Sequence, residues 1–241
     1  MFQYMKVAQM ADAASTTPTT GGDLHVSRSA TRALDLVDIV VTAGSISLTE
    51  AAEASGIPTS TTLRHLRALM GKGWLTRDSA GNFSVGPTFL RLGINAFREG
   101  PWARLTTAAL PHLETLAAVT QESAYLAVRD GSEAVYLSTV ESPRAIRHAG
   151  WVGRSVPLKD TAVGEALVAP LAFGPIPVFR NVGAVEEDAT ALCVPIADQG
   201  VVIGAFSLLG PNERMTAETD ASMAAALRDA SAALTLDLSG G

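Results

Sequence analysis

The chain has 241 residues, of which 47% are hydrophobic and 17% are charged, a composition that supports one large or two modest folded domains and excludes a largely disordered protein. Its net charge of −6 argues against contact with nucleic acid over the whole surface, and its single cysteine, Cys193, excludes an internal disulfide. We expect a cytoplasmic protein that does not bind membranes, because no apolar run approaches the ~18–20 residues of a membrane span and the N-terminus has no signal-peptide pattern.

The charges are distributed unevenly along the chain. Residues 24–100 contain eight Lys or Arg against six Asp or Glu, whereas residues 101–241 contain nine against sixteen. Within the first part, residues 58–82 hold four basic side chains and one acidic side chain. A local basic patch in an otherwise acidic protein indicates a confined contact with phosphate groups.

Three helices are expected after an N-terminal arm. Residues 1–23 are rich in Ala, Thr and Gly and are predicted to be flexible, because they offer little to bury. Apolar residues recur at helical spacing over 30–41, which predicts the first helix. Ser47 and Glu50 have the spacing of a capping box, which predicts the start of a second helix. Pro58 stands at a position where a third helix can begin.

A β-hairpin is expected directly after the third helix. The segments 74–77 and 82–85 flank the turn-forming sequence Asp78-Ser79-Ala80-Gly81. Three helices followed by a hairpin are the layout of a winged helix-turn-helix, which we assign to residues 24–86.

The third predicted helix has the composition of a DNA recognition helix. Short hydroxyl side chains in its first turns let the backbone approach a groove, and its cations can engage phosphate or guanine. An ordinary amphipathic helix with a solvated basic face would show the same pattern, but the adjoining hairpin and the local basic excess favour DNA binding. The predicted contacts, with His65 taken as a surface residue, are Thr59, Ser60, Thr61, Arg64, His65 and Arg67 in the helix and Arg77 and Asn82 in the hairpin.

A linker helix is predicted over 87–101 and a second domain over 102–241. The second domain mixes helical and strand patterns, which makes the whole chain an α+β protein. Its helices are expected at 102–119, 162–171 and 217–236, and its strands at 124–128, 134–140, 192–196 and 201–208.

The sequence offers no candidate for catalysis, a cofactor or a metal. The four histidines, His25, His65, His112 and His148, are scattered, and none accompanies a second cysteine. There is no Gly-rich phosphate loop and no nucleophile or zinc-hydrolase motif. We therefore predict a protein that is not an enzyme; an enzyme fused to a DNA-binding head is the less favoured alternative.

A loop leads into a helix between residues 153 and 167. Thr161 or Asp160 could cap this helix, and its first amides would then be free to cradle a small carboxylate. A capped helix without any ligand explains the same pattern equally well.

At this point the sequence resembles the IclR family of bacterial transcription regulators over roughly residues 27–238. The segments that carry the resemblance in the first domain are Arg32-Ala33-Leu34, Leu48-Thr49-Glu50-Ala51-Ala52, the run from Gly56 to Leu66, and Phe83-Ser84-Val85-Gly86-Pro87. Those in the second domain are Leu110-Pro111-His112-Leu113-Glu114, Gln121-Glu122-Ser123-Ala124, Val156-Pro157-Leu158, the run from Thr161 to Leu167, and Gly210-Pro211 with Arg214.

The resemblance implies a regulator, either repressor or activator, with a GAF-like effector domain. It also implies a homodimer formed through the winged-helix and linker region, often a dimer of dimers, that binds double-stranded operator DNA. The implied effector is a small organic acid or an aromatic metabolite. The residues that match the family's effector pocket are Thr161, Ala162, Gly164, Cys193 and Ser207. Some pockets of the family are also lined by an acidic residue upstream of the cysteine. Glu186 and Glu187 are the nearest candidates here, and we assign Glu187.

Three departures from the family pattern bear on the effector. The chain is shorter than the family between Leu171 and Phe179, which implies a more open or reshaped pocket and leaves a degenerate, ligand-free dimerisation domain controlled by a protein partner as the alternative. Glu165 stands where the family often has Lys, and Leu209 stands where a small polar residue often lies, which favours a more apolar ligand, or none.

Overall fold

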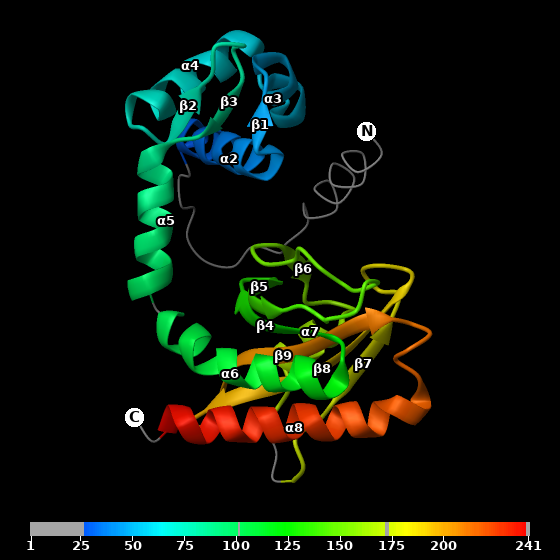
Figure 1. Cartoon of the computed structure of the whole chain (residues 1–241). Coiled ribbons are helices and arrows are strands. Elements are labelled where there is room, and N and C mark those ends of the chain that lie inside the picture. Colours follow the sequence, from blue (N-terminus) through cyan, green and yellow to red (C-terminus); the bar gives the residue numbers. More distant parts are fainter. Residues whose placement is uncertain (1–26, 101, 172–173, 240–241) are drawn as a thin grey trace, which may run out of the picture. The chain divides into compact units, whose positions relative to one another are not determined.

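The computed structural model describes residues 27–100, 102–171 and 174–239 (Figure 1). The chain divides into two compact units, with the boundary between Gly100 and Pro101, and each unit is described by itself. The predicted flexible arm, residues 1–23, lies outside the described residues.

The first unit is a small helical domain with a three-stranded antiparallel sheet. The strands lie in the order β1-β3-β2, and β2 and β3 form the predicted hairpin. The two-residue strand β1, which sequence reasoning missed, pairs with β3. The elements are α2 (Arg28–Ala43), β1 (Ser45–Ile46), α3 (Leu48–Ser55), α4 (Thr59–Gly71), β2 (Leu75–Arg77), β3 (Phe83–Val85) and α5 (Pro87–Glu99).

Local capping fixes where α3 begins and ends. The Ser47 hydroxyl accepts a hydrogen bond from the Glu50 amide at 3.3 Å, and the Glu50 carboxylate accepts one from the Ser47 amide at 2.9 Å. Gly56 then adopts the left-handed conformation, with φ of 63°, that ends the helix. The predicted capping box is therefore present, and it places α3 and α4 on either side of a sharp turn.

Helix α5 packs against the hairpin of the same unit. The Thr88 amide donates to the Gly73 carbonyl at 3.0 Å, and the rings of Trp74 and Phe89 meet edge to face with centroids 5.8 Å apart. The start of the predicted linker helix is thus fixed to the winged helix by its own contacts.

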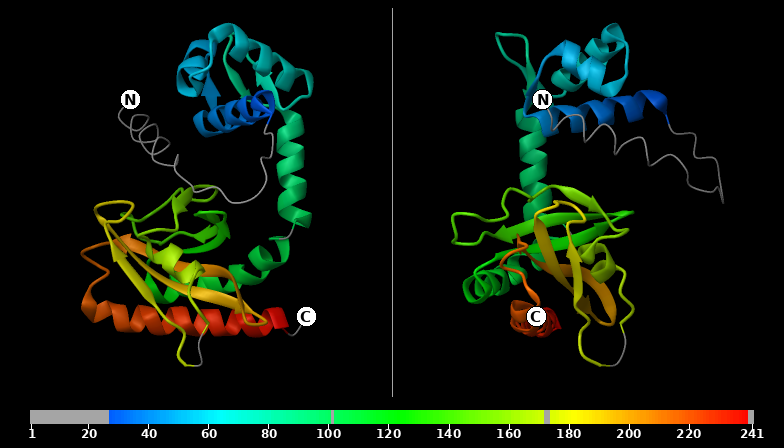
Figure 2. Two further views of the ribbon diagram at one scale, coloured as in Figure 1. Left: turned by 180° about the vertical axis from the view of Figure 1, so that it is seen from behind. Right: turned by 90° about the vertical axis from the view of Figure 1, so that its right-hand side faces the viewer.

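The second unit is a six-stranded antiparallel sheet in the order β6-β5-β4-β9-β8-β7. Helices α6 and α8 lie together along one face of this sheet, as the views from other sides in Figure 2 also show, and α7 packs on the opposite face. The elements are α6 (Ala103–Thr120), β4 (Ser123–Asp130), β5 (Glu133–Val140), β6 (Ser155–Pro157), α7 (Ala162–Leu167), β7 (Phe179–Val182), β8 (Ala189–Asp198), β9 (Val201–Pro211) and α8 (Ala217–Ser239).

Alternate residues of the central strands serve two different cores. Leu192 and Leu208 belong to the apolar core under α6 and α8, whereas their neighbours Cys193 and Leu209 belong to a smaller core under α7. The predicted α+β class is confirmed. Within the part of the chain that the structure describes, none of the helices combines the length with the hydropathy that a membrane span requires.

Two expectations for the second unit are corrected. Helix α7 ends at Leu167 rather than at Leu171, because Val168 leaves helical geometry and Pro170 has no amide to continue the ladder. The edge strands β6 and β7 were not expected, because three or four residues carry too little periodicity to be recognised.

Candidate DNA-binding face and effector pocket

Helix α4 presents a solvent-exposed basic face. Ser60, Arg64 and Arg67 are exposed and follow one another at helical spacing. Ala68 and Gly71 are exposed on the same side, so no bulky side chain stands between this face and a partner surface. The face can therefore approach a groove closely while its two guanidinium groups reach outward.

The start of α4 is held by a threonine that does not face solvent. Thr62 is fully buried, and its hydroxyl donates to the carbonyls of Ile57 and Pro58 at 3.2 and 3.3 Å. Thr59 is exposed and Thr61 is half-buried, so both remain candidates for contact with phosphate.

The expected surface position of His65 is wrong. The residue is only 7% exposed, because the positions 62, 65 and 66 form the packed side of the helix. We therefore remove His65 from the candidate DNA contacts.

The hairpin holds its basic side chain in place. The Arg77 Nε donates to the Gly81 carbonyl at 2.9 Å, and its guanidinium lies 5.1 Å from the centre of the Phe83 ring. Asn82 is half-buried, and its backbone N–H donates to the Asp78 carboxylate at 2.8 Å. Arg77 is thus exposed yet preorganised, whereas Asn82 mainly closes the turn.

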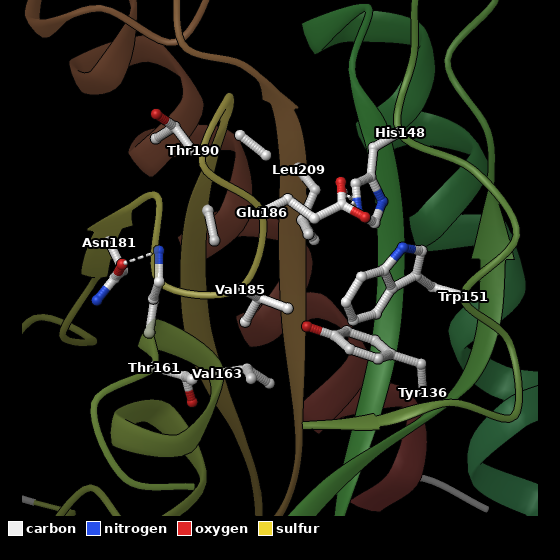
Figure 3. A pocket seen from close by; sticks show the side chains of 14 residues that line it. Tyr136, His148, Trp151, Thr161, Val163, Asn181, Val185, Glu186, Thr190 and Leu209 are labelled. Carbon is white, nitrogen blue, oxygen red and sulfur yellow. Dashed lines mark hydrogen bonds and ion pairs between the residues drawn. The ribbon is translucent and has the colours of Figure 1, made fainter. Parts of the chain in front are cut away.

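The second unit contains a narrow pocket on the α7 side of the sheet, with a cavity volume of about 30 Å³ beneath an open mouth (Figure 3). It is enclosed by β5, the loop that follows β5, the N-terminus of α7, and the segment between β7 and β8. The lining residues are Tyr136, His148, Trp151, Thr161, Ala162, Val163, Asn181, Ala184, Val185, Glu186, Ala189, Thr190, Ala191 and Leu209.

Two of the six predicted effector residues, Thr161 and Ala162, line this pocket. Gly164 is outside the lining and lies against the Leu158 carbonyl. A side chain at position 164 would clash with that carbonyl, so a glycine is required for the start of α7 to pack there. Glu187 is exposed and outside the lining, whereas Glu186 lies within it. The choice of Glu187 over its neighbour is therefore corrected.

Cys193 and Ser207 lie outside the pocket lining. Both are fully buried as cross-strand partners, and the Cys193 thiol donates to the Ser207 hydroxyl at 3.1 Å. Burial raises the pKa of the Cys193 thiol to about 12, so the sulfur is an inert, neutral group in the sheet.

The pocket has an aromatic wall that the sequence did not predict. Tyr136, His148 and Trp151 are buried and pack together: the Tyr136 and Trp151 rings meet edge to face at 5.7 Å, and the His148 and Trp151 rings are 5.0 Å apart. The His148 Nδ1 lies 2.8 Å from the Tyr125 hydroxyl, and its Nε2 lies 3.5 Å from the Glu186 carboxylate. His148 and Trp151 come from a loop without periodicity, so no sequence signal indicated them.

Burial lowers the pKa of His148 below its ordinary value of 6.5. Arg154 acts in the same direction, whereas the carboxylates of Glu186 and Glu141 oppose the shift. The imidazole is therefore neutral near neutral pH.

This lowered pKa predicts a pH-dependent stability. As pH falls through about 6.5, the unfolded chain gains a proton at His148 that the folded chain does not, so the free energy of unfolding decreases until the folded-state pKa is reached. The midpoint of urea unfolding should therefore drop more for the native protein than for His148→Gln between about pH 7.5 and about pH 5.5. An equal drop in both proteins would assign the pH dependence to other groups.

No group of three or more His, Cys, Asp and Glu side chains that could hold a metal ion occurs among the described residues.

The sequence matches two domain models of one family. One, described as "IclR helix-turn-helix domain", covers residues 29–79, and the other, "Bacterial transcriptional regulator IclR C-terminal", covers residues 103–173. The first match spans α2 to β2 and includes the basic face of α4. The second begins with α6 and includes the aromatic wall of the pocket.

The curated relatives named here are helix-turn-helix transcriptional regulators. The HTH-type transcriptional repressor AllR of Escherichia coli is 26% identical over 221 residues, which cover 77% of this chain and 80% of AllR. The HTH-type transcriptional regulators KipR of Bacillus subtilis and BhcR of Paracoccus denitrificans are 28% and 33% identical, over 57% and 59% of this chain. The matched region spans 54% of KipR and 50% of BhcR, about half of each protein.

Solved structures share the fold. An IclR homologue from Microbacterium hydrocarbonoxydans, complexed with 4-hydroxybenzoate, superposes with a TM-score of 0.73 at 22% identity, covering 88% of this chain and 100% of that one. A regulator from Alicyclobacillus acidocaldarius gives 0.71 at 21% identity, covering 87% and 98%. With both of its domains matched to models of a single family, the protein belongs to the IclR family of bacterial transcriptional regulators.

Proposed function

We propose that the protein is a transcriptional regulator, repressor or activator, that inserts α4 into the major groove of double-stranded operator DNA. The observation that carries this proposal is the exposed face of Ser60, Arg64 and Arg67, which is lined by small residues and followed by a hairpin with a preorganised Arg77. In a helix-turn-helix protein, such a face reads base edges while the flanking groups grip phosphates. The residues proposed to contact DNA are Thr59, Ser60, Thr61, Arg64, Arg67, Arg77 and Asn82.

The pocket of the second unit is proposed to bind a small-molecule effector that modulates DNA binding. The solved relative complexed with 4-hydroxybenzoate supports an organic acid or an aromatic compound as the starting expectation. Binding would act by changing the separation of the two DNA-reading heads of a dimer. Thr161 and Ala162 are the proposed effector contacts carried over from the sequence.

The active form is proposed to be a homodimer or a dimer of dimers. Leu90, Ile94 and Phe97 are exposed at one side of α5, an apolar stripe that a second copy of the chain would cover. A regulator of chromosomal genes acts in the cytoplasm, and we propose that location. The relatives named above are regulators, and no catalytic role is proposed.

Selection of duplex DNA from a random library with the full chain tests this function. We expect enrichment of an inverted repeat whose half-sites lie about 10 base pairs apart, or a multiple of that spacing. The affinity for the selected site should fall steeply between about 50 mM and 200 mM salt, because arginine contacts to phosphate release counterions. Failure to enrich any duplex at the lower salt would overturn the proposed function.

A further inference from the structure

The hydrogen-bonding side chains of the pocket are mostly occupied by the protein itself. The Thr161 hydroxyl donates to the Pro157 carbonyl at 2.7 Å and accepts from the Gly164 amide at 3.2 Å. The Asn181 amide group donates to the Asp160 carbonyl at 3.1 Å and accepts from the Ala184 amide at the same distance. The Thr190 hydroxyl donates to the Asn212 side chain at 2.7 Å. These polar groups hold the walls together, so Thr161 would contact an effector through its carbon atoms and not through a free hydroxyl.

The Tyr136 side chain lines the pocket and is 3% exposed, and it differs from these polar side chains in its hydrogen bonding. Its hydroxyl points into the pocket in Figure 3, and no hydrogen bond joins it to any described residue. Because no protein group occupies it, this hydroxyl is available to a ligand or to water in the pocket.

The formal charge of the lining is negative. Glu186 is its only Asp, Glu, Lys or Arg, and the Glu186 side chain is 49% exposed, which places the carboxylate at the mouth. His148 adds no positive charge, because burial lowers its pKa and keeps the ring neutral. Arg154 lies outside the lining, with its guanidinium 5.6 Å from the Trp151 ring.

The aromatic wall supplies the apolar surface of the pocket. The Tyr136 and Trp151 rings, which meet edge to face at 5.7 Å, offer a ligand aromatic contact without adding a positive charge to the lining. The indole nitrogen of Trp151 turns toward His148 in Figure 3, not toward the centre of the pocket. Leu209 and Ala162 complete an apolar interior.

We propose that the pocket selects a small ligand with an aromatic or apolar body and a positively charged nitrogen, rather than a free organic acid. The body packs against Tyr136, Trp151 and Leu209, the nitrogen faces the Glu186 carboxylate, and the Tyr136 hydroxyl accepts a hydrogen bond from it. This inference rests on the proposed effector function of the pocket and narrows the class of effector.

Matched amines and acids on the same carbon skeleton test this selectivity. Thermal unfolding and calorimetric titration of the full chain would use benzylamine and 4-hydroxybenzylamine against benzoate and 4-hydroxybenzoate. We expect the amines to raise the melting temperature and the acids to leave it unchanged. A larger shift with either acid, or no shift with either amine at millimolar concentration, would overturn the inference.

Two variants identify the contacts. Glu186→Gln should weaken amine binding about tenfold, because it removes the only formal charge of the lining. Its control is Glu187→Gln, which removes the adjacent exposed carboxylate outside the pocket and should leave amine affinity unchanged. Tyr136→Phe should weaken amine binding about three- to tenfold while preserving the ring.

Equal effects of the two glutamate variants would point to general surface charge and overturn the assigned contact. The outcome is separable from that of the proposed function, because selection of duplex DNA by the ligand-free chain does not depend on which small molecule binds. Binding of the acids instead of the amines would overturn the proposed ligand class, but it would not contradict the proposed function as a transcriptional regulator.

Discussion

Replacing Arg64 with alanine is expected to lower operator affinity by about 1–3 kcal/mol for each recognition helix, roughly 5- to 150-fold per helix. Arg64 lies at the centre of the exposed face of α4, between Ser60 and Arg67, where a guanidinium can bind a guanine edge with two hydrogen bonds. Among the described residues it makes no ion pair with a carboxylate, so its side chain is free for DNA. The loss should also relax the preference for guanine at one position of each half-site.

Gel-shift titration of the selected operator measures this effect, and the matched control is Arg144→Ala. Arg144 is exposed in the second unit and bears the same charge. The control should reduce affinity little, and both variants should melt at the native temperature, because neither side chain is buried. Native affinity and an unchanged footprint for Arg64→Ala would contradict the assignment of α4 as the recognition helix.

Replacing Arg214 with methionine is expected to reduce the stability of the second unit by about 3–5 kcal/mol. The Arg214 guanidinium binds the Glu122 carboxylate through two hydrogen bonds of 2.6 and 2.7 Å, and the Glu122 side chain is 2% exposed. Methionine keeps much of the side-chain volume but leaves a buried carboxylate without its counter-ion. That uncompensated charge, more than the lost attraction, causes the destabilisation.

Urea unfolding followed by a probe in the second unit measures this effect, and the chain offers two controls. Arg147→Met breaks an exposed ion pair with Glu141 and should leave the unfolding midpoint nearly unchanged. The double variant Arg214→Met with Glu122→Leu should recover most of the lost stability, because it removes the buried charge as well. A double variant no more stable than Arg214→Met alone would show that the pair acts through packing instead.

Local signals predicted the first unit well. The Ser47 and Glu50 capping box and the turn from Asp78 to Gly81 act through neighbours in the sequence, so their effect could be derived without the fold. His65 was misplaced because position 65 borders the packed side of the helix, and only the packing of α2 and α3 against α4 decides on which side it falls.

The pocket was predicted only in part, because it is assembled from distant segments. Thr161 and Ala162 could be identified from the start of α7 and the family resemblance. Tyr136, His148 and Glu186 meet only after β5, the loop behind it and the segment between β7 and β8 come together, which no local pattern encodes. Cys193 and Ser207 were expected to line the pocket but are fully buried outside its lining, because the register of β8 with β9 pairs them with each other inside the sheet.

The alternation of Leu208 and Leu209 along β9 has an evolutionary consequence. Leu208 packs under α6 and α8, while Leu209 reaches the pocket one residue later. In the proposed regulator, substitutions at the positions of β9 that face the same way as Leu209 would change which effector binds and leave the core under α6 and α8 intact. Such a regulator would acquire a new effector through a few mutations while it keeps its fold and its DNA-binding helix.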